Sequence, residues 1–156
     1  MGYKILIADD EAEIRDLLHL YLEKDGYEVI EAADGAQALS ALQDAALRNE
    51  SIDLVILDIM MPGIDGYRVL RNIRENSNIP VIMLSAKSGD EDKILGLDLG
   101  ADDYITKPFQ PLEAVARVNS NIRRFYALGA GRQKQVEELS VQDLKLDLQS
   151  CLLRQG

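Results

Sequence analysis

The stretch that decides the fold reads DLVILD and occupies residues 53–58. Four consecutive apolar residues stand between two aspartates, a pattern typical of a short strand that is buried on both faces of a parallel sheet. Apolar runs of this kind recur along the chain and predict strands at residues 3–8, 28–32, 53–57, 80–84 and 103–106. The sequence therefore predicts a sheet that other elements cover on both sides.

Segments with helical spacing of apolar residues separate these strands, and in the fourth segment the spacing is carried by Ile94 and Leu97. Gly26 and Gly100 stand where the first and fourth helices should end, because glycine adopts the left-handed conformation of a helix C-terminus at little cost. Strict alternation of strands and helices predicts an α/β fold with right-handed connections. The expected fold is a flavodoxin-like (βα)5 domain with strand order 2-1-3-4-5 and helices on both faces.

Composition and charge exclude several classes of protein. The chain of 156 residues is 47% hydrophobic and contains one cysteine, Cys151, so it has no internal disulfide, which indicates a reducing compartment and a cytoplasmic location. No apolar run approaches the roughly 20 residues of a membrane helix, so we expect no membrane partner. Residues 125–156 hold four basic and four acidic residues, so the whole net charge of −10 falls on residues 1–124. That acidic part repels nucleic acid, and any DNA contact must be made by a segment outside it.

Polar residues gather where the predicted strands end. Asp9 and Asp10 follow the first strand, Asp58 the third, Ser85 the fourth, and Lys107 comes just after the fifth. In open α/β sheets, ligands bind at the carboxyl ends of the strands near the point where strand order reverses. Three carboxylates so close together are costly unless a cation holds them, and oxygen ligands suit Mg²⁺ (or Mn²⁺). The alternative is that Asp9 and Asp10 only cap the first helix.

Asp58 is the candidate nucleophile of this site. A carboxylate with an ordinary pKa near 4 is ionised at neutral pH, so it needs no general base to attack phosphorus. Phosphoryl transfer depends on positioning and on stabilising the negative charge of the equatorial oxygens. A metal ion held by Asp10 and Asp58, the Lys107 ammonium group and the Ser85 hydroxyl would supply that stabilisation.

Taken together, these residues resemble the receiver domains of two-component response regulators. The motifs that carry the resemblance are ILIADDE (5–11), DLVILD (53–58), MPG with DG (61–66) and GADDYITKPF (100–109). The last motif is similar to that of the OmpR/PhoB-type subfamily, whose members carry a winged-helix DNA-binding domain after the receiver. The resemblance implies a phosphorelay protein that accepts a phosphoryl group from a cognate sensor histidine kinase. Such a protein is not an enzyme, because it catalyses only its own phosphorylation and dephosphorylation.

The resemblance also implies roles for single residues. Asp58 would be the phosphoacceptor, and the metal site would consist of Asp9, Asp10, Asp58 and the backbone carbonyl of Met60. Ser85 and Lys107 would contact the phosphate. Ser85 and Tyr104 would form the switch, with the tyrosine ring turning inward once the hydroxyl is recruited. The Lys107–Pro108 peptide would be cis.

Three other classes of protein remain as alternatives. A flavin-binding module of the same fold needs a phosphate-binding loop rich in Ser, Thr and Gly after the first strand, where this chain has Asp9-Asp10-Glu11. A phosphatase of the haloacid dehalogenase type needs a second aspartate two residues after the nucleophile, where this chain has Met60. A degenerate receiver would fold and dock without being phosphorylated.

The subfamily resemblance further implies a homodimer on phosphorylation. Its face would include the fourth helix, the fifth strand and the fifth helix, with Lys93 pairing Glu113 and Asp103 pairing Arg117. The expected domains are a receiver at residues 1–124, a linker at 125–138 and the start of a truncated winged-helix domain at 139–156. Short apolar runs in the last segment predict antiparallel strands. DNA binding would belong to the effector domain that is mostly absent from this sequence.

Overall fold

The computed structural model describes residues 2–86 and 99–129. Its sheet is parallel and has the order β2-β1-β3-β4-β5, which confirms the flavodoxin-like prediction. The strands are β1 (Lys4–Ala8), β2 (Glu28–Ala32), β3 (Leu54–Asp58), β4 (Val81–Ser85) and β5 (Asp103–Thr106). The order reverses between β1 and β3, so the carboxyl ends of these two strands define the place where a ligand is expected.

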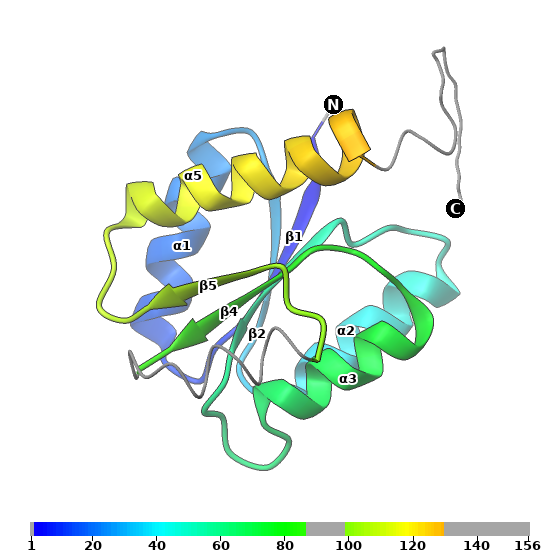
Figure 1. The fold of residues 1–156 in the computed structure, drawn as a ribbon. Coiled ribbons are helices and arrows are strands. Elements are labelled where there is room, and N and C mark those ends of the chain that lie inside the picture. The colour runs from blue at the N-terminus through cyan, green and yellow to red at the C-terminus, as the bar shows by residue number, and fades with distance from the viewer. Residues whose placement is uncertain (1, 87–98, 130–156) are drawn as a thin grey trace. The chain divides into compact units, whose positions relative to one another are not determined.

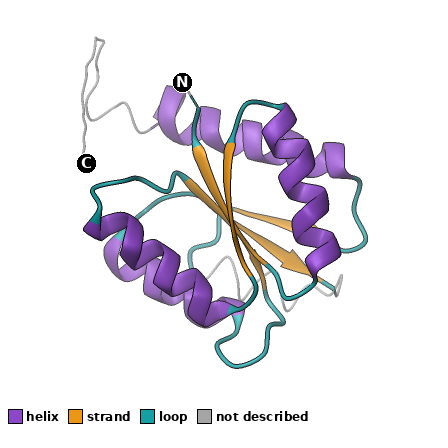
Figure 2. Ribbon diagram, turned by 180° about the vertical axis from the view of Figure 1, so that it is seen from behind, coloured by secondary structure: helices purple, strands orange, loops and turns teal. Residues whose placement is uncertain are grey.

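Helices cover both faces of the sheet. The described helices are α1 (Ala12–Lys24), α2 (Gly35–Leu47), α3 (Gly66–Asn76) and α5 (Pro111–Ile122). Figure 1 shows α1 and α5 on one side of the sheet and α2 and α3 on the other, and Figure 2 shows the same layers from behind. The helix predicted around Ile94 and Leu97 lies outside the described residues.

The core follows the two-residue period of the strands, because successive side chains point to opposite faces. On the face covered by α2 and α3, strand residues such as Leu57 and Met83 join helix residues such as Val69 and Leu70 in one apolar cluster. The alternate strand residues, among them Ile56, are equally buried. Each fully buried side chain of this size stabilises the fold by about 1.5–3 kcal/mol. The sheet is therefore a rigid platform for whatever stands at its carboxyl edge.

Two predicted strand ends need correction. The sequence analysis ended the third strand at residue 57 and the fourth at residue 84, but Asp58 and Ser85 are themselves the last strand residues. The reason is hydrogen bonding between neighbours, since Ile59 N donates to the carbonyl of Leu84 (3.0 Å) and Lys107 N donates to the carbonyl of Ser85 (2.7 Å). Both site residues consequently take their backbone position from the sheet.

The prediction that Gly26 follows the end of the first helix is confirmed, whereas the helix that Gly100 was predicted to end lies outside the described residues. Gly26, with φ 96°, and Gly100, with φ 104°, adopt the left-handed conformation that a side chain disfavours. Gly26 follows the end of α1, where its N–H donates to the carbonyl of Glu23. The chain can thus turn sharply into β2.

The chain separates into two units, Met1–Val118 and Asn119–Gly156. In the second unit the α-helical hydrogen bonding of α5 ends at Ile122, and Arg123–Gly129 form a π-helix. The predicted strands at residues 139–156 lie outside the described residues, as does most of the predicted linker. No helix in the described ranges has the length and apolar character to cross a membrane.

Candidate functional site

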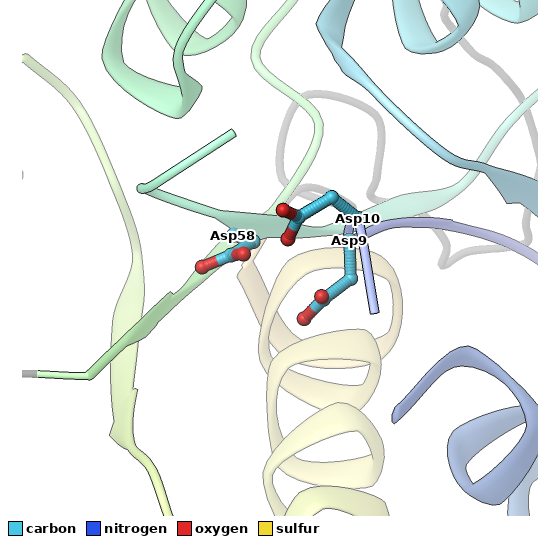
Figure 3. A group of neighbouring side chains, drawn as sticks. All are labelled: Asp9, Asp10 and Asp58. Carbon is cyan, nitrogen blue, oxygen red and sulfur yellow. The ribbon is translucent and has the colours of Figure 1, made fainter. Parts of the chain in front are cut away.

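Three carboxylates meet at the carboxyl edge of the sheet. Asp9 and Asp10 follow β1, and Asp58 ends the neighbouring strand β3, where Ala8 is in register with Leu57. One carboxylate oxygen from each aspartate lies within 4.8 Å of the other two. Figure 3 shows the three side chains gathered at the ends of the two strands. The predicted convergence of Asp9, Asp10 and Asp58 is therefore present in the structure.

Asp9 is the most deeply buried of the three, with no exposed surface. Its Oδ1 accepts a hydrogen bond from Glu11 N at 2.9 Å. Its Oδ2 is paired with the ammonium group of Lys107, whose Nζ lies 3.0 Å away, and accepts no other hydrogen bond within the described part of the chain. One ammonium group does not balance three neighbouring carboxylates, and a hard cation with oxygen ligands fits beside them. The donor set therefore suits Mg²⁺ or a similar ion.

Helix capping does not explain these aspartates. The residue at the N-cap of α1 is Glu11, and its side chain makes no capping hydrogen bond. By contrast, the Asp34 and Asp65 side chains each accept a bond from a backbone N–H in the first turn of α2 and α3. The alternative in which Asp9 and Asp10 serve only as caps is accordingly wrong.

Lys107 lies above the carboxylates with a nearly buried side chain. Its Nζ is 3.0 Å from Asp9 Oδ2, 3.1 Å from Glu11 Oε1 and 3.5 Å from Asp58 Oδ2. Burial lowers the pKa of the Lys107 ammonium group, but Asp9, Asp58 and Glu11 together outweigh burial and raise this pKa. The group therefore stays charged. The Lys107–Pro108 peptide is cis, as the resemblance implied.

The electrostatic state of Asp58 corrects the sequence analysis, which assumed an ordinary pKa. Asp58 is only 3% exposed. Burial first and Asp9 second raise the pKa of its carboxyl group to about 7, against the opposing effects of Lys107 and of the Met60 N–H. Close packing of like charges has this effect whenever no further cation compensates them. Near neutral pH, Asp58 is consequently ionised in only part of the metal-free molecules.

The loop after β3 is shaped by backbone contacts. Met60 N lies 3.4 Å from Asp58 Oδ1, and the Met60 side chain is 64% exposed. Gly66 N donates to the carbonyl of Ile59 at 2.9 Å. A Cβ at Gly66 would clash with the carbonyl oxygen of Asp58, so this position has no room for a side chain. The loop thereby returns closely past the candidate phosphoacceptor.

Ser85 and Tyr104 lie on the neighbouring strands β4 and β5 and are both buried. Met83 is in register with Tyr104, and Ser85 with Thr106, so the two predicted switch residues are offset by two residues in the register of β4 and β5. The Tyr104 ring belongs to the apolar cluster under α3, and its hydroxyl is 3.3 Å from the hydroxyl of Tyr67. The sequence analysis missed Tyr67, which only its position on α3 brings to this place.

An open pocket of about 500 Å³ lies at the carboxyl edge of the sheet, beside Asp58 and Lys107. Its lining consists of Asp10, Glu11, Ile14, Asp58, Met60, Ala86, Lys107 and Pro108. Glu11 is a second residue to which the sequence analysis gave no role, although its position directly after Asp9-Asp10 was a usable signal. The pocket therefore brings the carboxylates of Asp10 and Asp58 and the lysine to one solvent-accessible space, whereas Asp9 does not line it.

Of the residues predicted for the dimer face, Lys93 lies outside the described residues. Arg117 forms ion pairs within the chain, with Asp103 Oδ1 at 2.6 Å and with Glu113 Oε2 at 3.3 Å. The three described residues therefore form one connected group on β5 and α5.

A five-stranded parallel sheet that carries an aspartate cluster and a lysine at its carboxyl edge defines a class of α/β signalling modules. The family model described as "Response regulator receiver domain" matches residues 5–119. The chain therefore belongs to the response regulator receiver domains, which act in two-component signalling and are signalling proteins rather than classical enzymes.

Individual relatives agree with this family. Response regulator GtcR of Aneurinibacillus migulanus is 46% identical over all of this chain, and regulatory protein VanRc of Enterococcus gallinarum is 44% identical over 98% of it. The chain spans only 63% and 65% of the length of these two relatives.

Solved structures agree as well. The receiver domain of the Francisella response regulator 1452 is 40% identical, with a TM-score of 0.71 over 79% of this chain and 98% of that one. The BeF3-activated N-terminal receiver domain of Klebsiella pneumoniae RstA is 33% identical, with a TM-score of 0.70 over 77% of this chain and 98% of that one.

Proposed function

We propose that Asp58 accepts a phosphoryl group from a histidine kinase and that this reaction depends on a divalent metal ion. The observation that carries the proposal is the position of the Asp58 carboxylate. It ends a buried strand beneath an open pocket, next to two further carboxylates and 3.5 Å from the ammonium group of Lys107. This arrangement supports a nucleophile whose surroundings stabilise added negative charge.

In the proposed step, an ionised Oδ of Asp58 attacks the phosphorus atom of a phosphohistidine. A phosphorus–oxygen bond forms, the phosphorus–nitrogen bond breaks, and its electron pair stays on the imidazole, which takes up a proton. Lys107 turns its ammonium group from Asp9 and Glu11 towards a phosphoryl oxygen. The Ser85 hydroxyl donates a hydrogen bond to a second oxygen.

The metal ligands in this proposal are Asp9, Asp10, Asp58 and the backbone carbonyl of Met60. The three clustered carboxylates and the all-oxygen donor set support Mg²⁺, or Mn²⁺ in its place. When bound, such an ion neutralises part of the negative charge on the carboxylates and on the phosphoryl group. It also favours the ionised form of Asp58 over the protonated form.

We further propose that phosphorylation is read out by Ser85 and Tyr104. Once the hydroxyl of Ser85 turns to the phosphoryl group, it leaves the space between β4 and the Tyr104 ring, and the inward position of that ring is favoured. The 9% exposure of Tyr104 and its contact with Tyr67 support a stable inward position. Comparing Tyr67→Phe with the wild-type domain tests whether this hydroxyl contact matters.

The output proposed for the whole protein is dimerisation and control of transcription. We infer a cytoplasmic response regulator of the OmpR/PhoB type, with the receiver at residues 1–124, a linker at 125–138 and a winged-helix domain beginning at 139–156. Only that effector domain would bind DNA. The dimer would use Lys93, Asp103, Glu113 and Arg117, so the ion pairs that Arg117 makes within the chain would be exchanged for pairs across the interface.

Mass spectrometry after treatment with acetyl phosphate and Mg²⁺ tests the phosphoacceptor. We expect one added phosphoryl group on the peptide that contains Asp58, none in the Asp58→Asn variant, and none when EDTA removes the metal. Asp65→Asn is the matched control, because it removes one nearby carboxylate outside the cluster and asparagine caps α3 equally well. Full labelling of Asp58→Asn would overturn the assignment, and no labelling of the wild type would favour a degenerate receiver.

A further inference from the structure

Arg15, at the end of the first turn of α1, contacts the backbone of the segment Asp9–Glu11 that follows β1. This segment is called the aspartate loop below. Its Nη1 donates to the carbonyl oxygen of Asp9 at 2.7 Å, and its Nε lies 3.1 Å from Glu31 Oε1 on β2. The arginine side chain is only 18% exposed, so these two contacts are largely shielded from water. One guanidinium group thereby joins α1, β2 and the end of β1.

The acceptor on β2 is itself held in place. The second carboxylate oxygen of Glu31 lies 2.6 Å from His19 Nδ1, and His19 Nε2 lies 3.1 Å from Glu23 Oε2. Burial lowers the pKa of His19, but the bonds to Glu31 and Glu23 outweigh burial and raise this pKa. Both oxygens of Glu31 are therefore engaged, which restricts the rotation of its carboxylate and with it the position of Arg15.

The peptide that Arg15 contacts is the one that links Asp9 to Asp10. On the other side of Asp9, its N–H donates to the carbonyl of Ala32 at 3.1 Å. With hydrogen bonds on both sides, the backbone of Asp9 has little freedom to rotate. Because this peptide sets the directions in which the side chains of Asp9 and Asp10 leave the backbone, its orientation controls where the two carboxylates meet Asp58.

We propose that Arg15 is a positioning residue for the divalent-cation site, acting through the Asp9 carbonyl and braced by Glu31. This inference rests on the proposed binding of a divalent metal. Arg15 does not contact the ion or the reacting atoms. Partners that orient metal ligands in this way typically change metal affinity by about 10–100-fold when they are removed.

Electrostatics alone predicts the opposite sign, which makes the inference testable. A guanidinium group close to the carboxylates repels an incoming cation, so removing its charge should tighten Mg²⁺ binding if charge were its only effect. If Arg15 positions the carboxylates, its removal weakens Mg²⁺ binding. The direction of the change in the Mg²⁺ dissociation constant therefore separates the two effects.

The experiment is an Mg²⁺ titration of the full chain followed by amide NMR shifts, with urea unfolding of each variant. We expect Arg15→Gln to raise the dissociation constant about 10-fold. Arg15→Lys keeps the charge, but its single nitrogen cannot reach both acceptors, and we expect an increase of about threefold. Equal or tighter binding by Arg15→Gln overturns the inference. If that variant does not fold, unchanged binding by Arg15→Lys overturns it.

Arg74 provides the matched control. It too contacts backbone carbonyls, those of Gly100 at 2.9 Å and Ile79 at 2.7 Å, and its ion pair with Asp102 is 2.8 Å long. Arg74→Gln should lower stability and leave the Mg²⁺ dissociation constant within about twofold of wild type, because its partners do not carry the metal ligands. An equal loss of affinity in both variants would show a purely structural role for Arg15. A wild-type chain that binds no Mg²⁺ would instead refute the proposed function.

Discussion

Replacing Asp58 with asparagine should abolish phosphorylation and, in the same variant, stabilise the metal-free fold. The reason is the raised pKa of about 7, which means that the folded protein holds the Asp58 proton more tightly than the unfolded chain does. Above pH 7 the folded state must carry a buried charge beside Asp9 that the unfolded state carries in water. Asparagine removes that charge and keeps nearly the same shape.

The size of the effect follows from the shift. A rise from 3.8 to about 7 corresponds to roughly 4 kcal/mol at about 1.36 kcal/mol per pKa unit. Asp58 faces an open pocket, so water screens part of this penalty, and the asparagine amide must find new partners. We therefore expect Asp58→Asn to raise the free energy of unfolding by about 1–2 kcal/mol at pH 8.

The dependence on pH has a definite sign. Below about pH 4 the carboxyl group is protonated in both states, so Asp58→Asn should have the stability of the wild type. Between pH 4 and pH 7 the wild type loses stability relative to the variant as pH rises, and above pH 7 the difference is constant.

Urea unfolding in EDTA at pH 5, 6, 7 and 8 measures this difference. Asp65→Asn, which removes a half-buried carboxylate outside the cluster, should show a change below about 0.5 kcal/mol at every pH. Saturating Mg²⁺ should narrow the gap, because binding stabilises only the folded wild type. A variant that is less stable than wild type at pH 8, or a gap that does not change with pH, would refute the reasoning.

Three further outcomes are expected. Mg²⁺ should bind Asp58 about 10-fold more weakly at pH 6 than at pH 8, because the ion must displace a proton held with a pKa of about 7. Calorimetry in matched buffers measures this affinity, and an affinity that does not change with pH contradicts the prediction. Gly66→Ala should lower the free energy of unfolding in urea by about 1–3 kcal/mol, because the added Cβ clashes with the Asp58 carbonyl. Gly26→Ala has open space around the Cβ at φ 96°, so it should cost only about 1–2 kcal/mol of backbone strain and should not slow phosphorylation. Arg117→Ala should lower monomer stability by no more than about 1 kcal/mol through loss of its pair with Asp103. In sedimentation of the beryllofluoride complex, the same variant should show a smaller fraction of dimer than the wild type. An unchanged dimer fraction would remove Arg117 from the interface.

Much of the candidate site was predictable because it depends on strand ends. Parallel strands all finish at the same edge of a sheet, so apolar runs that end in Asp9, Asp58 and Ser85 were expected to bring these residues together. The errors of one residue at the ends of β3 and β4 arose because strand ends depend on hydrogen bonds from a neighbouring strand. The local sequence does not contain those bonds.

The sequence by itself determined the alternation of strands and helices, the strand order and the identity of the groups at the carboxyl edge. The alternation and the strand-end groups follow from residue spacing, and the strand order follows from the flavodoxin-like arrangement that such an alternation favours. Only the tertiary structure decided the raised pKa of Asp58, the sharing of Lys107 between Asp9 and Glu11, and the contact of Arg15 with the aspartate loop. Burial and short distances in the folded chain produce these properties, and the spacing of residues along the sequence specifies neither the burial nor the distances.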